Sequence, residues 1–263
     1  MDFLYISPEF PPYGEKFIRR LAGRGARIWA IGETDFYFMP KRLRSLLKWY
    51  VRTDLKDREK VRAAVETLLS VQAVMGFSQK FDLVESHNEQ WLRLEGFINE
   101  AFQIPGIRPP DLDRLKLKSD MKRMFRSNGF QVAPGERVLS VEHGLELART
   151  IGFPLILKPD EGVGASGIHK IVDEASLREL LPALMEPYVL EAFVDGAIVT
   201  YDGLTDRNGS VVFESSLVYA NGVLENVLGR DVFFYVNRHI PQPLATAGKR
   251  LVSDFGIRRK FFH

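Results

Sequence analysis

Residues 153–172 read FPLILKPDEGVGASGIHKIV, and this stretch decides the fold of the second half of the chain. Its apolar start predicts a strand that delivers Lys158, and residues 168–172 predict a second strand leading away. The loop between them is made of glycines and small residues, whose backbone can approach phosphate oxygens closely. This layout indicates a nucleotide-binding flap between two strands. A plain hairpin turn without a ligand is the alternative.

The context of the glycines argues against three other phosphate-binding loops. A dinucleotide-binding fold needs the glycines to open a helix, whereas β-like residues follow Gly167 and helix-forming sequence begins only near Asp173. A P-loop ends in Gly-Lys-Ser/Thr, but Ile168 follows Gly167. A protein kinase carries its lysine on a later strand, and Lys158 precedes the glycines.

The whole chain has the composition of an ordinary globular protein. It has 263 residues, 45% hydrophobic and 27% charged, with a formal net charge of +2, so it offers no broad field for nucleic acid or an anionic membrane. It contains no cysteine, which excludes disulfides, thiolate catalysis and cysteine zinc sites. No apolar run approaches the roughly 18 to 20 residues of a membrane helix. We expect a cytoplasmic protein with no nucleic-acid or membrane partner.

The first part of the chain alternates strand and helix patterns. Such alternation predicts a parallel sheet with helices on its faces, so we expect residues 1–110 to form a Rossmann-like α/β domain. The expected strands are residues 3–7, 27–32 and 81–85, and the expected helices are residues 16–24, 58–74 and 90–101.

The expected strand ends of this domain suggest substrate contacts. No glycine fingerprint follows the first strand, where Ser7-Pro8-Glu9 stands, so dinucleotide binding there is not expected. Ligands still favour the carboxyl ends of parallel strands, which makes Ser7, Glu9, Asn88 and Glu89 candidates for substrate contact. The alternative is that they are loop and helix-cap residues.

The second part of the chain mixes helices with antiparallel strands, an α+β pattern. Residues 107–110, Ile-Arg-Pro-Pro, mark the expected joint between the parts. A basic helix is predicted over residues 112–128, and residues 198–205 are expected to pair with 211–219 through the turn Asp-Arg-Asn-Gly. Further predicted elements are helices at 141–150 and 245–255 and strands at 130–134, 188–194 and 259–263.

Four segments occur in the order and spacing of one known superfamily. They are Lys118 on the basic helix, residues 129–135, Lys158 with its glycine loop, and Glu191 to Gly196. The chain resembles the ATP-grasp superfamily, closest to the carboxylate-amine ligase type related to the ATP-binding modules of biotin carboxylase and carbamoyl phosphate synthase.

The resemblance implies a domain order for the whole chain. It places a Rossmann-like pre-ATP-grasp domain at residues 1–110 and an ATP-grasp nucleotide-binding module at residues 111–263. Within the module it implies a linker helix region at 111–135, a flap subdomain at about 136–190 and the start of a C-terminal subdomain at about 191–263.

The resemblance also implies the ATP contacts. Lys118 and Lys158 would hold the phosphates, and the backbone of the hinge residues Glu191, Ala192 and Val194 would bind the adenine edge. The glycine loop would close over the terminal phosphate through Gly162, Gly164, Ala165, Ser166 and Gly167. A carboxylate that contacts ribose in the family is missing, because Ala197 and Ile198 stand there; Asp195 and Asp202 are the substitutes we consider.

The expected metal ligands do not lie in this chain. In the family, the strand that resembles residues 259–263 continues into a glutamate and later a Glu-x-Asn pair, which hold the magnesium ions. We therefore expect ATP with magnesium as cofactors, the magnesium ligands beyond residue 263, and a C-terminally truncated fragment of poor catalytic competence. The five histidines are scattered without ligand spacing, and no catalytic residue is assigned.

The function implied for the intact protein is an ATP-dependent ligase. It would phosphorylate an unidentified carboxylate substrate to an acyl phosphate, which an amine or similar nucleophile then attacks. Two alternatives stay open: a small-molecule kinase of the same fold, and a non-catalytic nucleotide-binding or regulatory module. A homodimer also stays open.

Overall fold

The computed structural model describes residues 1–162, 166–220 and 233–263. The chain divides into two compact units, Met1–Leu112 and Asp113–His263, here called unit 1 and unit 2. The boundary falls beside the Ile-Arg-Pro-Pro segment at residues 107–110. Gly164 and Ala165, which the sequence places in the nucleotide loop, lie outside the described residues.

Unit 1 is built on a parallel four-stranded sheet of order β3-β2-β1-β4. The strands are β1 (Asp2–Ile6), β2 (Arg27–Gly32), β3 (Leu47–Arg52) and β4 (Leu83–Glu85). Its helices are α1 (Gly14–Ala22), α2 (Lys41–Arg44), α3 (Arg58–Val74) and α4 (Leu92–Ala101), with short 3-10 turns at Phe36–Phe38 and Glu89–Trp91. The predicted Rossmann-like α/β pattern is therefore confirmed, and β3 and α2 are additions that the sequence pattern did not predict.

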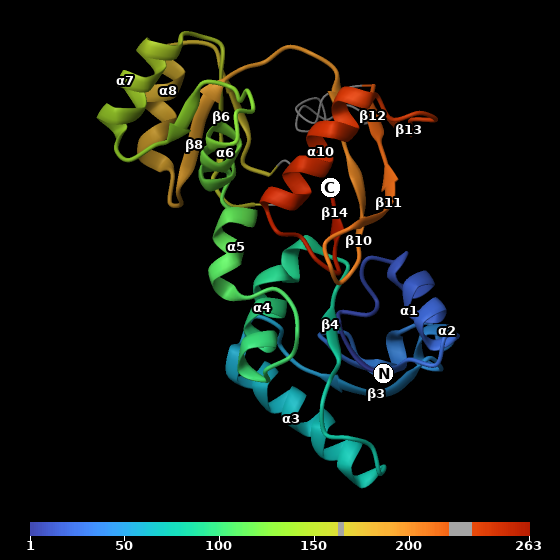
Figure 1. Ribbon diagram of the computed structural model, residues 1–263. Coiled ribbons are helices and arrows are strands. Elements are labelled where there is room, and N and C mark those ends of the chain that lie inside the picture. The colour runs from blue at the N-terminus through green and yellow to red at the C-terminus, as the bar shows by residue number, and fades with distance from the viewer. Residues whose placement is uncertain (163–165, 221–232) are drawn as a thin grey trace. The chain divides into compact units, whose positions relative to one another are not determined.

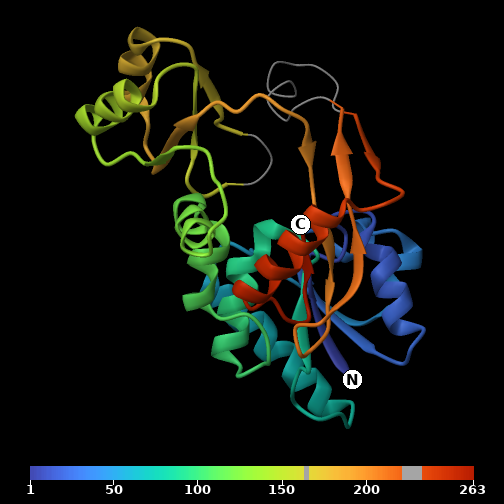
Figure 2. The same cartoon turned by 45° about the horizontal axis from the view of Figure 1, so that its top comes forward.

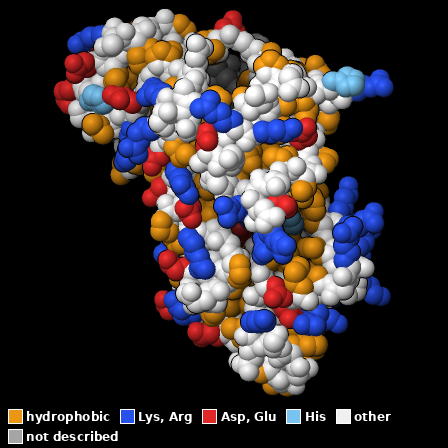
Figure 3. Space-filling view, in the orientation of Figure 1, with side chains coloured by type: hydrophobic (Ala, Val, Ile, Leu, Met, Phe, Trp, Pro, Cys, Tyr) orange, Lys and Arg blue, Asp and Glu red, His pale blue; other side chains and the backbone are white. Residues whose placement is uncertain are grey.

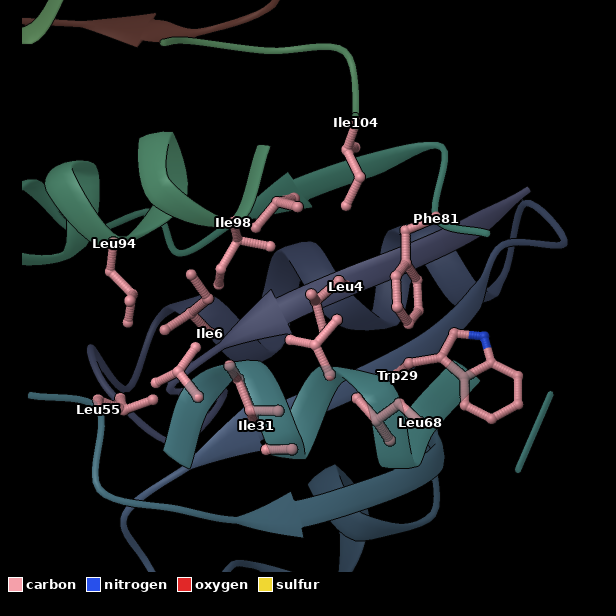
Figure 4. Close-up of a cluster of buried hydrophobic side chains, with 14 of the residues drawn as sticks. Leu4, Ile6, Trp29, Ile31, Leu55, Leu68, Phe81, Leu94, Ile98 and Ile104 are labelled. Carbon is pink, nitrogen blue, oxygen red and sulfur yellow. The ribbon is translucent and has the colours of Figure 1, made fainter. Parts of the chain in front are cut away.

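Successive side chains of a strand point to opposite faces of the sheet, and in unit 1 each face has its own hydrophobic core. Leu4 and Ile6 of β1 belong to a cluster with buried residues of α3 and α4, such as Leu68 and Ile98. Figure 4 shows these side chains filling the space between the sheet and the two helices. On the other face, Tyr5 packs among residues of α1 and α2. Figures 1 and 2 show α1 and α2 together on one side of the strands.

Charged side chains of both signs are spread over the visible surface (Figure 3), with Lys and Arg gathered over α1 and α2. These helices carry Arg19, Arg20, Lys41, Arg42 and Arg44. One of these cations, Arg42, is paired with Glu15 of α1 at 2.7 Å, an exposed contact of modest energy that ties the two helices together.

Two helices stand at the boundary between the units and the start of unit 2, where the sequence pattern predicted one. The observed helices are α5 (Pro109–Lys116) and α6 (Lys118–Ser127), separated by Leu117 in an extended conformation. The prediction of one helix over 112–128 was wrong because apolar spacing continues through the break. The first N–H groups of α6 are satisfied by Asp160, a partner 41 residues away from Ser119 along the chain.

The first sheet of unit 2 is antiparallel, of order β5-β8-β6-β7. Its strands are β5 (Gly135–Arg137), β6 (Leu155–Pro159), β7 (His169–Ile171) and β8 (Tyr188–Ala192). The helices α7 (Val141–Ile151) and α8 (Glu174–Leu180), followed by a 3-10 turn at Leu181–Ala183, cover it through a core that contains Leu145, Leu157, Leu177 and Leu190. The strand pair around the glycine loop, β6 and β7, is as predicted, whereas the strand expected at 130–134 forms at β5 instead.

The rest of unit 2 forms two small antiparallel sheets, β11-β10-β14 and β13-β12-β9. Their strands are β9 (Ile198–Val199), β10 (Asp202–Thr205), β11 (Val211–Ser215), β12 (Leu217–Tyr219), β13 (Phe234–Val236) and β14 (Phe261–Phe262). The hairpin pairing of 198–205 with 211–219 is confirmed, but each expected strand is split between the two sheets. Helix α10 (Gln242–Asp254) packs through Ala245 and Val252 onto Tyr201. Among the described residues, no helix is long and apolar enough to span a membrane.

Candidate functional site

The candidate site of unit 2 is organised by β6. Burial alternates along this strand, with Leu155, Leu157 and Pro159 turned into the core and Lys158 on the other face. The Lys158 ammonium ion-pairs with Glu191 Oε1 of the neighbouring strand β8 at 2.5 Å. Both side chains are mostly enclosed, with 22% of Lys158 and 13% of Glu191 exposed, so the pair is partly screened from water.

A second lysine, Lys122, binds the same carboxylate. Its Nζ lies 2.5 Å from Glu191 Oε2 and donates to the carbonyl oxygen of Ala133 at 2.7 Å. The sequence analysis did not single out Lys122, whose side chain is only 9% exposed. The helical spacing contained the signal: Lys122 lies three residues before Phe125, which packs on the aromatic rings of Phe130 and Phe255.

Burial and ion pairing have opposite effects on the pKa values of Glu191 and Lys122. Burial raises the pKa of Glu191, but the ammonium groups of Lys158 and Lys122 outweigh it and leave the pKa below its usual value. Burial lowers the pKa of Lys122, and its contact with Glu191 opposes that shift without reversing it. Two ammonium groups around one carboxylate leave an excess positive charge, which suits an anionic ligand.

Lys118 is brought to the end of β6 by an unpredicted residue, Asp160. The Asp160 carboxylate, 1% exposed, accepts hydrogen bonds from Ser119 N and Ser119 Oγ, both at 2.8 Å. A carboxylate at the first turn of α6 satisfies free N–H groups and favours the helix dipole. The Lys118 Nζ then lies 3.5 Å from the carbonyl oxygens of Asp160 and Gly162. Both predicted phosphate lysines therefore lie along the short segment from β6 to the start of the glycine loop.

The described part of the glycine loop includes Gly162, Ser166 and Gly167. Gly162 and Ser166 are exposed. Gly167 has φ +72°, and a Cβ there would lie 3.0 Å from both Pro159 Cγ and Tyr188 Oη. The chain thus needs glycine at the second end of the loop.

In the hinge after β8, two backbone N–H groups already donate hydrogen bonds to other parts of unit 2. Ala192 N donates to Pro134 O at 2.8 Å and Phe193 N donates to Pro154 O at 3.1 Å, whereas Val194 is 68% exposed. Of the two substitutes for the ribose carboxylate, Asp195 is exposed. The other, Asp202, accepts from Thr200 at 2.6 Å and contacts His263 at 2.5 Å.

The four substrate candidates of unit 1 have different surroundings. Ser7 is buried with φ +53° at the end of β1, and Glu9 Oε2 is a buried atom with no hydrogen-bond partner among the described residues. Asn88 caps the turn at Glu89–Trp91 by accepting from Gln90 N at 3.0 Å, and Glu89 is exposed.

A further contact at the strand ends was not predicted: the Tyr5 hydroxyl lies 2.6 Å from His87 Nδ1. Burial, followed by the charges of Glu85 and Glu95, raises the pKa of Tyr5. Across residues 1–162, 166–220 and 233–263, no group of three or more metal-ligating side chains gathers closely enough for a metal ion.

A family model of known proteins matches the first part of unit 2. The family model for the carbamoyl-phosphate synthase L chain, ATP binding domain, matches residues 113–199, a range that holds Lys118, Lys122, Lys158, Asp160 and Glu191. Residues 113–199 are therefore similar to an ATP-binding domain of the ATP-grasp superfamily. The resemblance predicted from the sequence is thereby confirmed.

Curated ATP-grasp relatives are distant and much longer. The carbamoyl phosphate synthase large chain of Xylella fastidiosa is 26% identical over 136 residues, which is 49% of this chain and 12% of that protein. The enzyme of Vibrio cholerae is 23% identical over 226 residues, covering 79% of this chain and 20% of that protein. The chain therefore spans a fifth or less of these two relatives.

Solved ATP-grasp structures agree with the fold over nearly the whole chain. L-amino acid ligase from Bacillus licheniformis superimposes with a TM-score of 0.73 at 18% identity, covering 99% of this chain and 61% of that one. N5-carboxyaminoimidazole synthetase from Staphylococcus aureus, complexed with ADP, gives 0.70 at 17% identity, covering 97% and 62%. At such identities the likeness establishes the fold, and the predicted fold class is confirmed.

Proposed function

We propose that unit 2 binds ATP at the segment from β6 to the glycine loop and along β8, and that the whole protein is an ATP-dependent ligase. The carrying observation is the pair of lysines, Lys122 and Lys158, that converge on Glu191 at 2.5 Å each, with Lys118 held at the start of the glycine loop. The excess positive charge matches a polyanion, and the family model that covers these residues is that of an ATP-binding domain.

The proposed ATP contacts follow the sequence prediction. Lys118 and Lys158 neutralise phosphate charge, and the loop from Gly162 to Gly167 covers the terminal phosphate. The hinge backbone at Glu191, Ala192 and Val194 binds adenine. The resemblance implies magnesium as a second cofactor, which would neutralise phosphate charge when bound.

The proposed reaction has two steps. A carboxylate oxygen of the substrate attacks the γ-phosphorus of ATP, the bond to the β-phosphate oxygen breaks, and an acyl phosphate and ADP result. An amine then attacks the acyl carbon and expels phosphate, losing a proton. The lysines lower the barrier of the first step by holding the charges in place and need no protein nucleophile. The names of the similar solved enzymes, an amino acid ligase among them, support this class of reaction.

The primary experiment is calorimetric titration of this chain with ATP, in parallel with GTP as a base-specific control. We expect saturable ATP binding that Lys158→Ala weakens by ten-fold or more. Absence of heat and of ATP-induced thermal stabilisation in the parent chain would remove the nucleotide site from the proposal.

Activity is to be measured on the full-length protein with magnesium. Phosphate release that depends on a carboxylate together with an amine supports the ligase, whereas ADP formation with a phosphorylated product points to a kinase of the same fold. The non-catalytic module is favoured by one feature, Ala197 and Ile198 at the ribose-carboxylate position. It predicts ATP binding without turnover in every substrate pool.

We propose a cytoplasmic location, which the absence of cysteine and the use of ATP favour. One of the similar solved structures is a biotin carboxylase domain dimer, so a homodimer is one candidate state of this protein. Light scattering of the protein in solution measures its oligomeric state.

A further inference from the structure

The two lysines that share Glu191 are held differently. Lys122 is 9% exposed and has two contacts, Glu191 Oε2 at 2.5 Å and the carbonyl oxygen of Ala133 at 2.7 Å. Lys158 is 22% exposed, and among the described residues Glu191 is its hydrogen-bonding partner. Lys122 is thus held by the Ala133 carbonyl as well as by Glu191, whereas Lys158 is the more exposed of the two lysines.

This difference matters once an anion arrives. A lysine that turns toward phosphate must leave its carboxylate, and an enclosed carboxylate without a counter-ion is strongly disfavoured. If Lys158 were the sole partner of Glu191, its transfer to phosphate would strand that charge. With Lys122 in place, the Glu191–Lys122 pair stays neutral and the second ammonium is available.

We propose that Lys122 is a positioning residue of the nucleotide site, the resident counter-ion of Glu191 that frees Lys158 to bind the phosphates of ATP. The inference rests on the proposed function, because it concerns how the same site receives its ligand. Lys122 acts through Glu191 and touches no substrate itself.

A double-mutant cycle measured by ATP titration tests this role. Lys122→Met should weaken ATP binding ten-fold or more, because Lys158 then stays paired with Glu191. Adding Glu191→Gln should restore the affinity of the Lys122→Met chain to within three-fold of Glu191→Gln alone, since no carboxylate remains to hold Lys158. A merely structural lysine would give losses that add.

One control tests whether the loss of any lysine–glutamate pair weakens ATP binding, and a second deals with misfolding of the Lys122→Met chain. Lys249→Met breaks another lysine–glutamate pair of unit 2, Lys249 with Glu214 at 3.0 Å, and should leave ATP affinity within two-fold. If Lys122→Met alone does not fold, the comparison of Glu191→Gln with the double variant carries the test, because both lack the enclosed carboxylate.

The outcomes separate the two proposals. A parent chain that binds ATP, with additive losses in the cycle or an unchanged Lys122→Met affinity, overturns the role of Lys122 and leaves the nucleotide site standing. A parent chain that does not bind ATP overturns both. Restoration by Glu191→Gln supports both.

Discussion

At the scale of single residues, two lysines of unit 2 converge on Glu191 near the end of β8. Glu191 binds two ammonium groups, and the position of Lys158 relative to it decides whether the cation is available to a ligand. The sequence singles out Lys158 as a candidate phosphate ligand because it stands shortly before a glycine loop. Lys122 could not be recognised in the same way, since a lysine on a basic helix is more often solvated and its partner lies 69 residues away.

Replacement of Lys158 by alanine should affect binding far more than folding. Glu191 keeps its contact with Lys122 and is not left as an unpaired enclosed charge, so we expect a change of only about 1 kcal/mol in the free energy of unfolding, the net contribution of one hydrogen bond. ATP affinity should fall ten- to hundred-fold, which corresponds to the loss of about 1.5–3 kcal/mol for a hydrogen bond to a charged group. Titration calorimetry and urea unfolding of the same preparations measure the two effects. Equal loss in both would contradict the assignment.

Acid should weaken unit 2 through Glu191. Its pKa is lowered in the folded chain from its usual value of 4.5, so its contribution to stability is fully present above pH 4.5 and is lost as the pH falls through the folded pKa. We expect the free energy of unfolding to decline below pH 4.5, and Glu191→Gln to flatten this decline. Urea unfolding at a series of pH values below and above 4.5 measures it. An identical pH dependence in both chains would show that other carboxylates dominate.

The second end of the glycine loop should demand glycine for two reasons. Gly167→Ala combines an unfavourable positive φ of +72° with contacts of 3.0 Å to Pro159 and Tyr188. Gly152→Ala, with φ +86° and no atom within 4 Å, separates the effects because it has the backbone strain alone. We expect about 1 kcal/mol for Gly152→Ala and a larger loss for Gly167→Ala. Equal losses in denaturant unfolding would mean that the contacts relax without cost.

At the scale of elements, the start of α6 depends on a residue from another segment. Asp160 follows β6 and satisfies Ser119 at the first turn of the helix, which fixes the direction from which Lys118 approaches the loop. Leu117 is extended for the same reason, and α5 and α6 become separate helices. Apolar periodicity cannot reveal such a break, because it reports which side chains are buried and not which N–H groups lack an intrahelical partner.

Removing this cap should disturb both stability and binding. Asp160→Ala removes a buried carboxylate and its two hydrogen bonds to the half-buried start of α6, and we expect a loss of about 1–3 kcal/mol with weaker ATP binding through Lys118. The matched control is Ser140→Ala, which removes the N-cap contact of Ser140 with His143 N in α7. It should cost about 1 kcal/mol and leave ATP affinity unchanged. Unaltered ATP affinity in the Asp160→Ala chain would dissociate the cap from the site.

At the scale of the whole molecule, each unit has its own hydrophobic core. Leu68 is fully buried in the core of unit 1, and Leu157 is fully buried in the core of unit 2. Separate cores of this size let each unit keep its own structure when the other is perturbed. The L-amino acid ligase from Bacillus licheniformis is longer, because this chain covers 61% of it.

Core truncations should therefore have local effects on ATP protection. Leu68→Ala and Leu157→Ala should each cost about 2–5 kcal/mol in their own unit. Hydrogen exchange should show that ATP slows exchange in the β6–β8 region of the Leu68→Ala chain as in the parent, whereas Leu157→Ala reduces this effect. Loss of ATP protection in both variants would falsify independent stability of the units.

The sequence by itself determined the fold class, the order of the strands and helices along most of the chain, and the place of Lys158 shortly before the glycine loop. These follow from local patterns: apolar alternation, helical spacing and glycine placement act over a few residues. Only the tertiary structure decided that Lys122 is enclosed against Glu191, that Asp160 starts α6, and that the strands at 198–205 and 211–219 divide between two sheets. Each of these joins groups distant along the chain, where burial of charge and satisfaction of backbone N–H groups outweigh local preference.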